Sequence, residues 1–466
     1  MPIRSRKNHS TYRLYLSGYI SFVLIFLFFA PGLYGNRVEV PGEWKVGVSR
    51  IEITPEKAMR MSGYTSRVQP AEEAVHSLWA KALTFEDTKG NQAVLITTDL
   101  VGIPKYVSDS IRNQLEKRYS LSRAQIILSS SHTHTGPVLK DPTDVVYFFT
   151  PEEVETIKDY TGTLINKIID LVGESLKSKE PARVYASNGI ARFQVNRRNN
   201  NERELTGQTV LNGPNDYAVP VLKVENKDGT IKAIAFGYAC HATTIGITKW
   251  SGDYPGFAQI ELEKAHPGIT ALFFQGAGGD LNPLPRGKIS FAKQYGKTLA
   301  ASVEKVLDEE MRELPSQLST AYADLNLSFA ALPTKGELME IVEKESGWEK
   351  QWASRYLDIL EKEKKINNTY PYPVQVWQLG DQMIASIGGE PVVDYAISLK
   401  RIFGEDIFVL GYCNDVMGYI PSVRVLREGG YEGFSSQMSY GLPAAWMADI
   451  EVRIIGQVVE LAKKVN

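Results

Sequence analysis

The chain has 466 residues, of which 43% are hydrophobic and 10% aromatic, and this is enough apolar material for a large packed core. Its 52 basic and 54 acidic side chains give a net charge of −2, and no long run of one sign stands out, so the concentrated basic surface of a nucleic-acid-binding protein is not expected. The two cysteines, Cys240 and Cys413, are too few for a disulfide scaffold, and the sequence does not decide whether they pair.

The first 35 residues predict a secretory signal. Four basic residues precede an apolar run over residues 19–30, and Pro31 follows with small residues. This order of basic, apolar and small-residue regions is typical of a signal peptide. The run is short for a transmembrane span, which needs about 20 residues, so cleavage is favoured over a retained anchor. We therefore expect export to a periplasmic or extracellular location, with membrane association through an uncleaved N-terminal segment as the alternative.

Residues 36–466 predict one large α/β catalytic domain. Short apolar runs rich in β-formers alternate with helix-like stretches, and each run ends abruptly in a polar or glycine-rich loop. The runs cover residues 93–98, 125–130, 234–240, 271–274, 382–387 and 407–410, and the helix-like stretches cover 107–119, 151–176, 256–265 and 291–309. Continuous apolar strands predict a mixed, largely parallel sheet with flanking helices. In such folds, ligand sites form at the carboxyl ends of the strands, where these polar loops lie. The charged segment 334–365 is typical of a solvated surface helix.

Candidate metal ligands follow three of these runs. His132 and His134 come directly after the second run, and side chains two apart in a strand point to the same side, so both imidazoles can serve one site. His241 follows the third run and Glu390 the fifth. Each residue alone also fits an ordinary structural role: a turn, a core histidine, or a carboxylate that caps a helix beginning at Pro391. Together, at three strand ends, they form the kind of ligand set that hydrolytic zinc enzymes use, with a position left open for water.

Two further features could bind an anion. The stretch 275–280, which contains Gly278, Gly279 and Asp280, can place several backbone N–H groups in one concavity that holds an anion or a developing oxyanion. The same glycines fit a tight turn that needs a positive φ equally well. Arg197 could clamp an anion or orient a carboxylate, or it could be a surface charge. The residues alone leave these alternatives open.

Taken in order, these pieces resemble the catalytic domain of the neutral, non-lysosomal ceramidases. The resemblance runs from about residue 44 to the end of the chain, and its matching segments are residues 46–55, 61–64, 130–137, 196–197, 240–243, 251–253, 279–283, 389–391 and 414–420. It implies one Zn²⁺ per chain at the strand ends and hydrolysis of the N-acyl amide bond of ceramide or a related N-acyl lipid. It also implies contact with a membrane surface as a route for such a substrate.

The resemblance assigns roles residue by residue. The family's zinc ligands fall on His132, His241, Glu390 and Tyr419, and His134 is placed beside the metal or against the substrate amide. The catalytic residues implied are His134, Tyr419, Asn282 and Asp280, and the substrate-binding residues implied are Arg197, Tyr431, Gly63, Gly278 and Gly279. The assignment of Tyr419 as a ligand follows from the resemblance alone. A phenol near zinc can ligate the ion or donate to an oxyanion.

The chain departs from the family pattern at two points. Asn282 stands where the family has its active-site serine, and an amide cannot act as an acyl-accepting nucleophile. Hydrolysis through zinc-activated water would not need the serine. The family usually carries a β-sandwich domain after the catalytic part, and we expect none here. Two alternatives stay open: a zinc hydrolase of the same fold that acts on another amide or ester, such as an N-acyl or O-acyl carbohydrate, and a non-catalytic relative. Acyl chain length, head group and oligomeric state are not indicated.

Overall fold

Residues 43–141, 145–208 and 210–465 are described by a computed structural model of the chain. The predicted signal region, residues 1–35, lies outside the described residues. Pro41–Asn466 group into one unit by their contacts, and the whole structure described below belongs to that unit. Within the described ranges, no helix combines the length and the apolar character that crossing a membrane would require.

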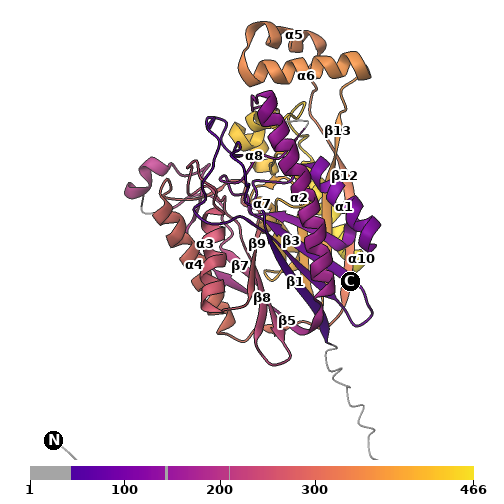
Figure 1. The fold of residues 1–466 in the computed structure, drawn as a ribbon. Helices are drawn as coiled ribbons and strands as arrows, with labels where there is room; N and C mark the ends of the chain where they lie inside the picture. The colour runs from indigo at the N-terminus through magenta and orange to yellow at the C-terminus, as the bar shows by residue number, and fades with distance from the viewer. Residues whose placement is uncertain (1–42, 142–144, 209, 466) are drawn as a thin grey trace, which may run out of the picture. The chain divides into compact units, whose positions relative to one another are not determined.

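The centre of the described structure is a mixed sheet of nine strands (Figure 1). Its order is β4-β3-β2-β1-β5-β7-β8-β9, and β11 pairs with β5. The strands are β1 (Trp44–Glu52), β2 (Trp79–Glu86), β3 (Gln92–Thr98), β4 (Ile126–Ser130), β5 (Glu180–Ile190), β7 (Ala218–Asn226), β8 (Ile231–Tyr238), β9 (Thr270–Gln275) and β11 (Arg312–Glu313). A mixed sheet with flanking helices was the predicted fold class, and it is confirmed.

The direction of the strands differs from the prediction. Among the described strands of this sheet, the parallel pairs are the outermost one at each edge, β3 with β4 and β8 with β9. The pairs between them are antiparallel. The prediction of a largely parallel sheet is therefore wrong. It rested on the continuous apolar runs, which arise here because other layers cover both faces of the sheet and bury side chains of either orientation.

A second sheet covers one face of the central sheet. It consists of β12 (Leu318–Ser328), β13 (Thr369–Leu379), β14 (Gln382–Ile387) and β16 (Phe408–Leu410), in that order. Leu83 and Phe85 of the central sheet share one apolar cluster with Trp377 and Phe408 of the second sheet. Burying a large apolar side chain contributes about 1.5–3 kcal/mol, so this interface is a main source of stability.

Helices cover the two outer faces. On the central sheet lie α1 (Lys105–Tyr119), α2 (Pro151–Lys177), α3 (Asp253–Ala265) and α4 (Ile289–Leu307), and on the second sheet lie α7 (Asp394–Phe403) and α10 (Ile450–Val465). The four predicted helices are confirmed to within a few residues at each end. The start of α2 shows the local cause: Thr150 Oγ1 accepts from the Glu153 N–H at 3.2 Å, Glu153 Oε2 accepts from the Thr150 N–H at 2.8 Å, and Pro151 occupies the first helical position.

The charged segment 334–365 folds as a helical hairpin between β12 and β13. Its helices are α5 (Lys335–Lys344) and α6 (Gly347–Glu363), which Figure 1 shows beyond the ends of those two strands. The outer face is charged and solvated, as predicted. The inner face is apolar, because Leu338 and Trp352 are buried in a cluster with Val145. The Trp352 Nε1–H also donates to Leu442 O at 2.8 Å, which ties the hairpin to the C-terminal part of the chain.

The loops that follow the parallel strands meet at one edge of the two sheets. After β16, the Gly411 N–H donates to Gln275 O at the end of β9 (3.0 Å), and the Asn414 N–H donates to Leu128 O in β4 (2.7 Å). The loop after β4 forms a bridge with the loop after β8. The three parallel pairs, with β14 and β16 as the third, thus bring their carboxyl ends together. This is the arrangement that the sequence predicted for the polar loops.

Candidate metal centre

Four side chains from different loops converge at this edge. His132 follows β4, His241 follows β8, and Glu390 and Tyr419 are paired across two short parallel strands, β15 (Glu390–Pro391) and β17 (Tyr419–Ile420). Glu390 Oε2 lies 3.1 Å from His132 Nε2 and 3.2 Å from His241 Nε2, and the Tyr419 hydroxyl lies 3.1 Å from His241 Nε2. All four are almost fully buried. These are the residues that the resemblance assigned as zinc ligands.

The backbone around the ligands is strained and tightly packed. His132 adopts a φ of 58°, and Tyr412 and Asn414 beside it adopt 56° and 66°, a region that costs a non-glycine residue about 1–3 kcal/mol. Gly389 has a φ of 64°, and a Cβ there would lie 2.7 Å from Gly418 O, so glycine is needed for β15 to approach β17. Strain of this kind persists where the surrounding structure fixes it, as at ligand sites.

The hydrogen bonds of the two imidazoles set which nitrogen faces the site. His132 Nδ1 lies 2.6 Å from Val101 O and His241 Nδ1 lies 2.8 Å from Gly278 O. A carbonyl oxygen can only accept, so each Nδ1 carries a proton, and a neutral ring then presents its lone pair at Nε2. Burial and the Arg197 charge lower the pKa of His241 to about 4, which keeps that ring neutral near pH 7.

The donor set fits a zinc ion. Two imidazole lone pairs face a carboxylate oxygen in a buried space, and a cation between them would satisfy all three buried acceptors. Zinc bonds to nitrogen and oxygen of about 2.0–2.1 Å in a tetrahedron place the ligand atoms about 3.3 Å apart. The observed separations of 3.1 and 3.2 Å agree with that spacing. His134 Nε2 lies at the same distance, 3.1 Å, from His132 Nε2, and with His132 and His241 it forms a cluster of three histidines that could hold a metal ion. Nitrogen and oxygen donors are also the ligand types that zinc takes.

His134 lies next to these ligands and faces the cavity. Its Nε2 is 3.1 Å from His132 Nε2, and the Tyr64 ring packs on it with centroids 4.9 Å apart. Gly63 has a φ of 96°, and a Cβ there would lie 2.6 Å from the His134 ring, so this glycine makes room for the imidazole. Burial and the neighbouring rings of His132 and His241 lower the pKa of His134 well below its ordinary value.

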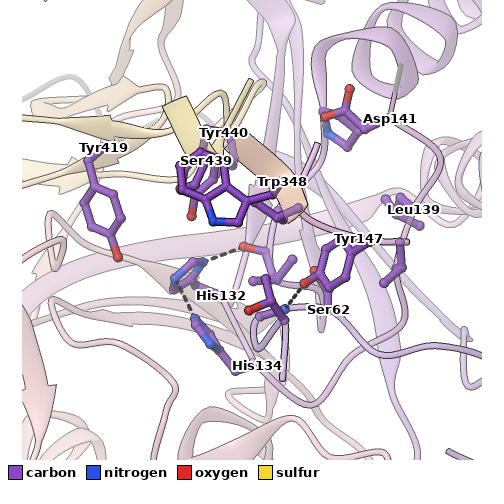
Figure 2. Close-up of a pocket in the computed structure, with 18 of the residues that line it drawn as sticks. Ser62, His132, His134, Leu139, Asp141, Tyr147, Trp348, Tyr419, Ser439 and Tyr440 are labelled. Atoms are coloured by element: carbon purple, nitrogen blue, oxygen red, sulfur yellow. Dashed lines mark hydrogen bonds between the residues drawn. The ribbon is translucent and has the colours of Figure 1, made fainter. Parts of the chain in front are cut away.

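A cavity of about 460 Å³ opens in front of the metal centre. Figure 2 shows His132, His134 and Tyr419 at one side of it, with Trp348, Ser439 and Tyr440 grouped above them. Its wall combines polar side chains with apolar ones from several loops and from α6, and includes Gly63, Val101, Val138, Leu139, Val146, Tyr147, Val416 and Tyr431. A site with ligands at one side and a largely apolar wall suits a substrate that carries a polar reacting group on an apolar body.

Arg197 is a partly buried residue that contacts three side chains of the site, and it is not a surface charge. It follows β6 (Gln194–Asn196), and its Nη2–H donates to the Tyr419 hydroxyl oxygen at 2.9 Å. Its Nε–H donates to Glu432 Oε1 at 2.7 Å, and its Nη1–H donates to Asn282 Oδ1 at 3.3 Å. Burial raises the pKa of Tyr419, and the Arg197 cation opposes that rise. The structure therefore brings Asn282 and Tyr419 to one guanidinium.

The glycine-rich loop forms neither the anion-binding concavity nor the positive-φ turn that the sequence analysis offered as alternatives. The Gly278 N–H donates to Gly276 O and the Gly279 N–H to Pro391 O, so these amides do not form an anion-binding concavity. Neither glycine has a positive φ. A Cβ at Gly278 would lie 2.7 Å from Cys240 N, and one at Gly279 would lie 2.7 Å from Glu390 O. The glycines allow three backbones to pack closely behind the ligands, and their assignment to substrate binding is corrected accordingly.

Asp280 also acts behind the site. Its Oδ1 accepts from the Val393 N–H at 2.9 Å, and its Oδ2 accepts from Asn196 Nδ2–H at 2.9 Å. Arg424 Nη2 lies 3.4 Å from the same Oδ2. The carboxylate is fully buried and fastens β6 to the loop after β15. These contacts do not support the prediction that Asp280 is catalytic, and they give it a positioning role.

Three residues at the site were missed by the sequence reasoning. Tyr412 packs its ring on His132, with centroids 4.4 Å apart, and its hydroxyl lies 3.4 Å from Glu390 Oε2. Tyr440 donates its O–H to Glu390 Oε1. Glu432 fixes Arg197, as described above. Tyr412 could have been found from its place directly after a strand, whereas nothing in the sequence marks Tyr440 or Glu432.

Tyr431 and the cysteines complete the placement of the predicted residues. Tyr431 lines the cavity, remains 51% exposed, and meets the Tyr419 ring edge-on at 5.3 Å. Cys240 and Cys413 are both buried free thiols, so they do not pair.

Comparison with known proteins agrees with this geometry. The family model of the N-terminal part of neutral/alkaline non-lysosomal ceramidase matches residues 44–304. Neutral ceramidase B and neutral ceramidase A of Dictyostelium discoideum are 27% and 26% identical over 270 and 265 residues, and neutral ceramidase of Drosophila melanogaster is 24% identical over 270. Each match covers 52% of this chain and 36% of the relative, so the chain matches about a third of the length of these relatives.

Two solved structures resemble this fold over most of the chain. Neutral ceramidase from Pseudomonas aeruginosa superposes with a TM-score of 0.69 at 19% identity, covering 90% of this chain and 74% of that one. A ceramidase complexed with C2 gives a TM-score of 0.70 at 18% identity, covering 90% and 75%. At this level of identity the likeness shows a shared fold.

Proposed function

Because the chain belongs to the neutral/alkaline non-lysosomal ceramidase family, we propose that it is a zinc-dependent amidohydrolase that cleaves the N-acyl amide bond of ceramide or a related N-acyl lipid. The observation that carries the proposal is the convergence of His132, His241, Glu390 and Tyr419 beside a largely apolar cavity. One zinc ion per chain is expected. The P. aeruginosa relative is a neutral ceramidase, which supports a lipid amide as the substrate class.

The four ligands would hold the ion through His132 Nε2, His241 Nε2, Glu390 Oε2 and the Tyr419 oxygen. A bound zinc ion supplies activation of water at neutral pH and polarisation of the substrate carbonyl. The carbonyls of Val101 and Gly278 fix the ligand tautomers before substrate arrives. Tyr412 and the glycine-rich loop pack behind the ligands and exclude bulk water from that side.

The residues around the ligands supply orientation and hydrogen bonds. Burial and the neighbouring imidazoles lower the pKa of His134, so at neutral pH its ring is neutral and can donate a hydrogen bond from one nitrogen and accept one at the other. Arg197 holds Tyr419 and Asn282 on one guanidinium. Because Asn282 Oδ1 accepts from Arg197, its Nδ2–H₂ group points elsewhere and can donate to a substrate oxygen. Asn282 therefore serves as a hydrogen-bond donor in this proposal and not as a nucleophile.

Hydrolysis of a labelled ceramide tests the proposal. Wild type should release fatty acid, lose this activity in a strong chelator, and regain it when Zn²⁺ is restored. Activity that is insensitive to the chelator would contradict zinc dependence. Asn282→Ser is measured alongside: an increase in rate would indicate that mechanism or substrate has drifted at this position.

Asn282 also supports a second candidate substrate. A serine at this place is part of the family pattern, and its replacement favours a zinc hydrolase that acts on another amide or ester. A panel of N-acyl lipids, N-acyl sugars and simple esters separates the two candidates. A clear preference for ceramide would remove the second one.

Export is proposed from residues 1–35 alone. The basic, apolar and small-residue order of this region supports a cleaved signal and a periplasmic or extracellular protein. Cell fractionation with N-terminal sequencing of the mature protein tests it. A cytoplasmic protein that retains Met1 would contradict it, and a membrane-bound protein with an intact N-terminus would favour the anchor.

A further inference from the structure

One short segment contacts the metal centre at three points. It comprises a π-helical turn (Tyr431–Ser435) and α9 (Ser436–Ser439), and it ends at Tyr440. Glu432 Oε1 accepts from Arg197, which in turn donates to the Tyr419 hydroxyl. The Gln437 Nε2–H donates to Tyr419 O at 3.2 Å. Irregular π-turns are frequent at functional sites. This one contains Glu432 and leads into α9, which carries Gln437 and precedes Tyr440.

Tyr440 makes the third contact, with the oxygen of Glu390 that the imidazoles do not face. Its O–H donates to Glu390 Oε1, whereas Oε2 lies within 3.1 and 3.2 Å of His132 and His241. Tyr412 reaches Oε2 only at 3.4 Å, which is a weak contact.

The carboxylate needs such a contact because its last torsion is soft. The torsion that turns a glutamate carboxylate has a broad minimum, so an unsupported carboxylate can present either oxygen or both. A donor on Oε1 leaves Oε2 as the oxygen directed at the imidazole nitrogens. We propose that Tyr440 is a positioning residue that holds Glu390 in the orientation the metal centre requires. This inference rests on the metal centre of the proposed function.

The helical hairpin α5–α6 fixes Tyr440 from the other side. The Tyr356 O–H donates to Gly441 O at 2.6 Å, and Arg355 Nη1–H donates to the same oxygen at 3.0 Å. The Trp352 Nε1–H donates to Leu442 O at 2.8 Å. The backbone directly after Tyr440 is therefore held by three side chains of α6. Through this connection the inserted hairpin supports the position of a metal ligand as well as the wall of the cavity.

Tyr440 also lines the cavity, so a substrate contact is the competing role. The two roles differ in what they predict for the protein without substrate. A substrate contact leaves the affinity for zinc unchanged, whereas a positioning residue of Glu390 changes it. Losing the partner that orients a metal ligand typically weakens metal affinity by about 10–100-fold.

The test compares the zinc affinity of Tyr440→Phe with that of wild type. Metal-free proteins are titrated with Zn²⁺ in competition with a chromophoric chelator, and the visible spectrum of the Co²⁺-loaded forms is recorded. Tyr295→Phe is the matched control, because it removes another buried phenol, on α4, whose O–H donates to Pro285 O at 2.7 Å. The unfolding midpoint of each metal-free protein shows that the fold is retained.

We expect Tyr440→Phe to bind Zn²⁺ about 10–100-fold more weakly and to shift the Co²⁺ spectrum, with Tyr295→Phe like wild type. In a Glu390→Gln background, Tyr440→Phe should have little further effect, because the two residues act as a unit. Equal zinc affinity and an unchanged spectrum in Tyr440→Phe would overturn the inference while leaving the proposed function intact. Failure of wild type itself to bind Zn²⁺ would overturn the proposed function, and the two failures are therefore distinguishable.

Discussion

At the scale of single residues, backbone carbonyls decide how the ligands point. Val101 O and Gly278 O each accept from an Nδ1–H, so both imidazoles present Nε2 to the same Glu390 oxygen. The ligand orientation is thus built into loops that pack without the ion. His132 is held in this way with its Nε2 beside Glu390, whereas the Nδ1 of His134 has no hydrogen-bond partner in the described structure, and both rings line the cavity.

Removal of one ligand is the first prediction at this scale. His132→Ala should lose stoichiometric zinc and should reduce ceramide hydrolysis by more than about 100-fold. Removing a residue that only hydrogen-bonds a metal ligand already lowers metal affinity or activity by about 10–100-fold, and removing the ligand itself should cost more. Zinc content is measured by elemental analysis and activity by fatty-acid release. His266→Ala, which removes a histidine paired with Glu304 on the surface, should match wild type in both. Retained zinc and full activity in His132→Ala would refute the ligand assignment.

Gly63 gives a second prediction, because its Cα lies against His134. Gly63→Ala places a Cβ 2.6 Å from the His134 ring and should lower kcat/KM by about 10–100-fold through displacement of that ring. Gly90→Ala is the control: Gly90 has a similar φ of 85°, but a Cβ there meets nothing within 4 Å. Both variants should lose about 1–2 kcal/mol of stability from the left-handed conformation. Equal activity in the two variants would show that the close approach to His134 does not matter.

The sequence placed the proposed ligands at strand ends, but it did not reveal the residues that contact them. His132, His241 and Glu390 could be found because each follows an apolar run directly, and chain direction brings such ends together. Tyr440 could not be found in this way, since it reaches Glu390 only through an irregular turn that no local pattern marks. The role of the glycine-rich loop was predicted wrongly for a related reason. A sequence shows where glycine occurs, but it does not show whether the fold needs the glycine amide as a donor or the space left by the missing Cβ.

At the scale of elements, the predictable features were those that depend on local periodicity. The helices α1, α2, α3 and α4 appear within a few residues of the helix-like stretches of the sequence. The direction of the strands could not be read from their apolar pattern. An antiparallel strand that is covered by a helix on one face and by a sheet on the other has the same continuous apolar sequence as a buried parallel strand. The second sheet, which covers the inner face, was therefore the feature that made the direction of the strands unpredictable.

The hairpin α5–α6 contributes a wall of the cavity, and this gives a prediction for α6. Trp348→Ala should raise KM for a long-chain substrate by about tenfold, because the indole lines the cavity and supplies apolar contact area. Zinc content and the unfolding midpoint should stay close to those of wild type. Met339→Ala, which truncates an exposed side chain of α5, should leave KM unchanged. An unchanged KM in Trp348→Ala would mean that the substrate does not extend along this wall.

At the scale of the whole molecule, the metal centre lies where both sheets end. The proposed ligands follow β4 and β8 of the central sheet and β14 and β16 of the second sheet. A bound ion would therefore fasten two layers that otherwise meet through apolar packing. A ligand that binds only the folded state stabilises it by about 2.7 kcal/mol at a free concentration 100 times its Kd.

Metal removal should consequently lower the stability of the entire unit. We expect dialysis against a strong chelator to lower Tm by several degrees, and added Zn²⁺ to restore it, because the ion binds the folded state alone. In His132→Ala the same treatments should leave Tm unchanged. A wild-type Tm that is insensitive to both treatments would contradict a zinc ion shared by the two sheets.

The central claim is that His132, His241, Glu390 and Tyr419 together hold one zinc ion. The most direct measurement is an anomalous difference map from crystals of the protein, recorded on both sides of the zinc absorption edge. We expect a single strong peak about 2.0–2.2 Å from His132 Nε2, His241 Nε2, Glu390 Oε2 and the Tyr419 oxygen. A map of the zinc-supplemented protein with no peak among these four atoms, or with its peak elsewhere, would contradict it.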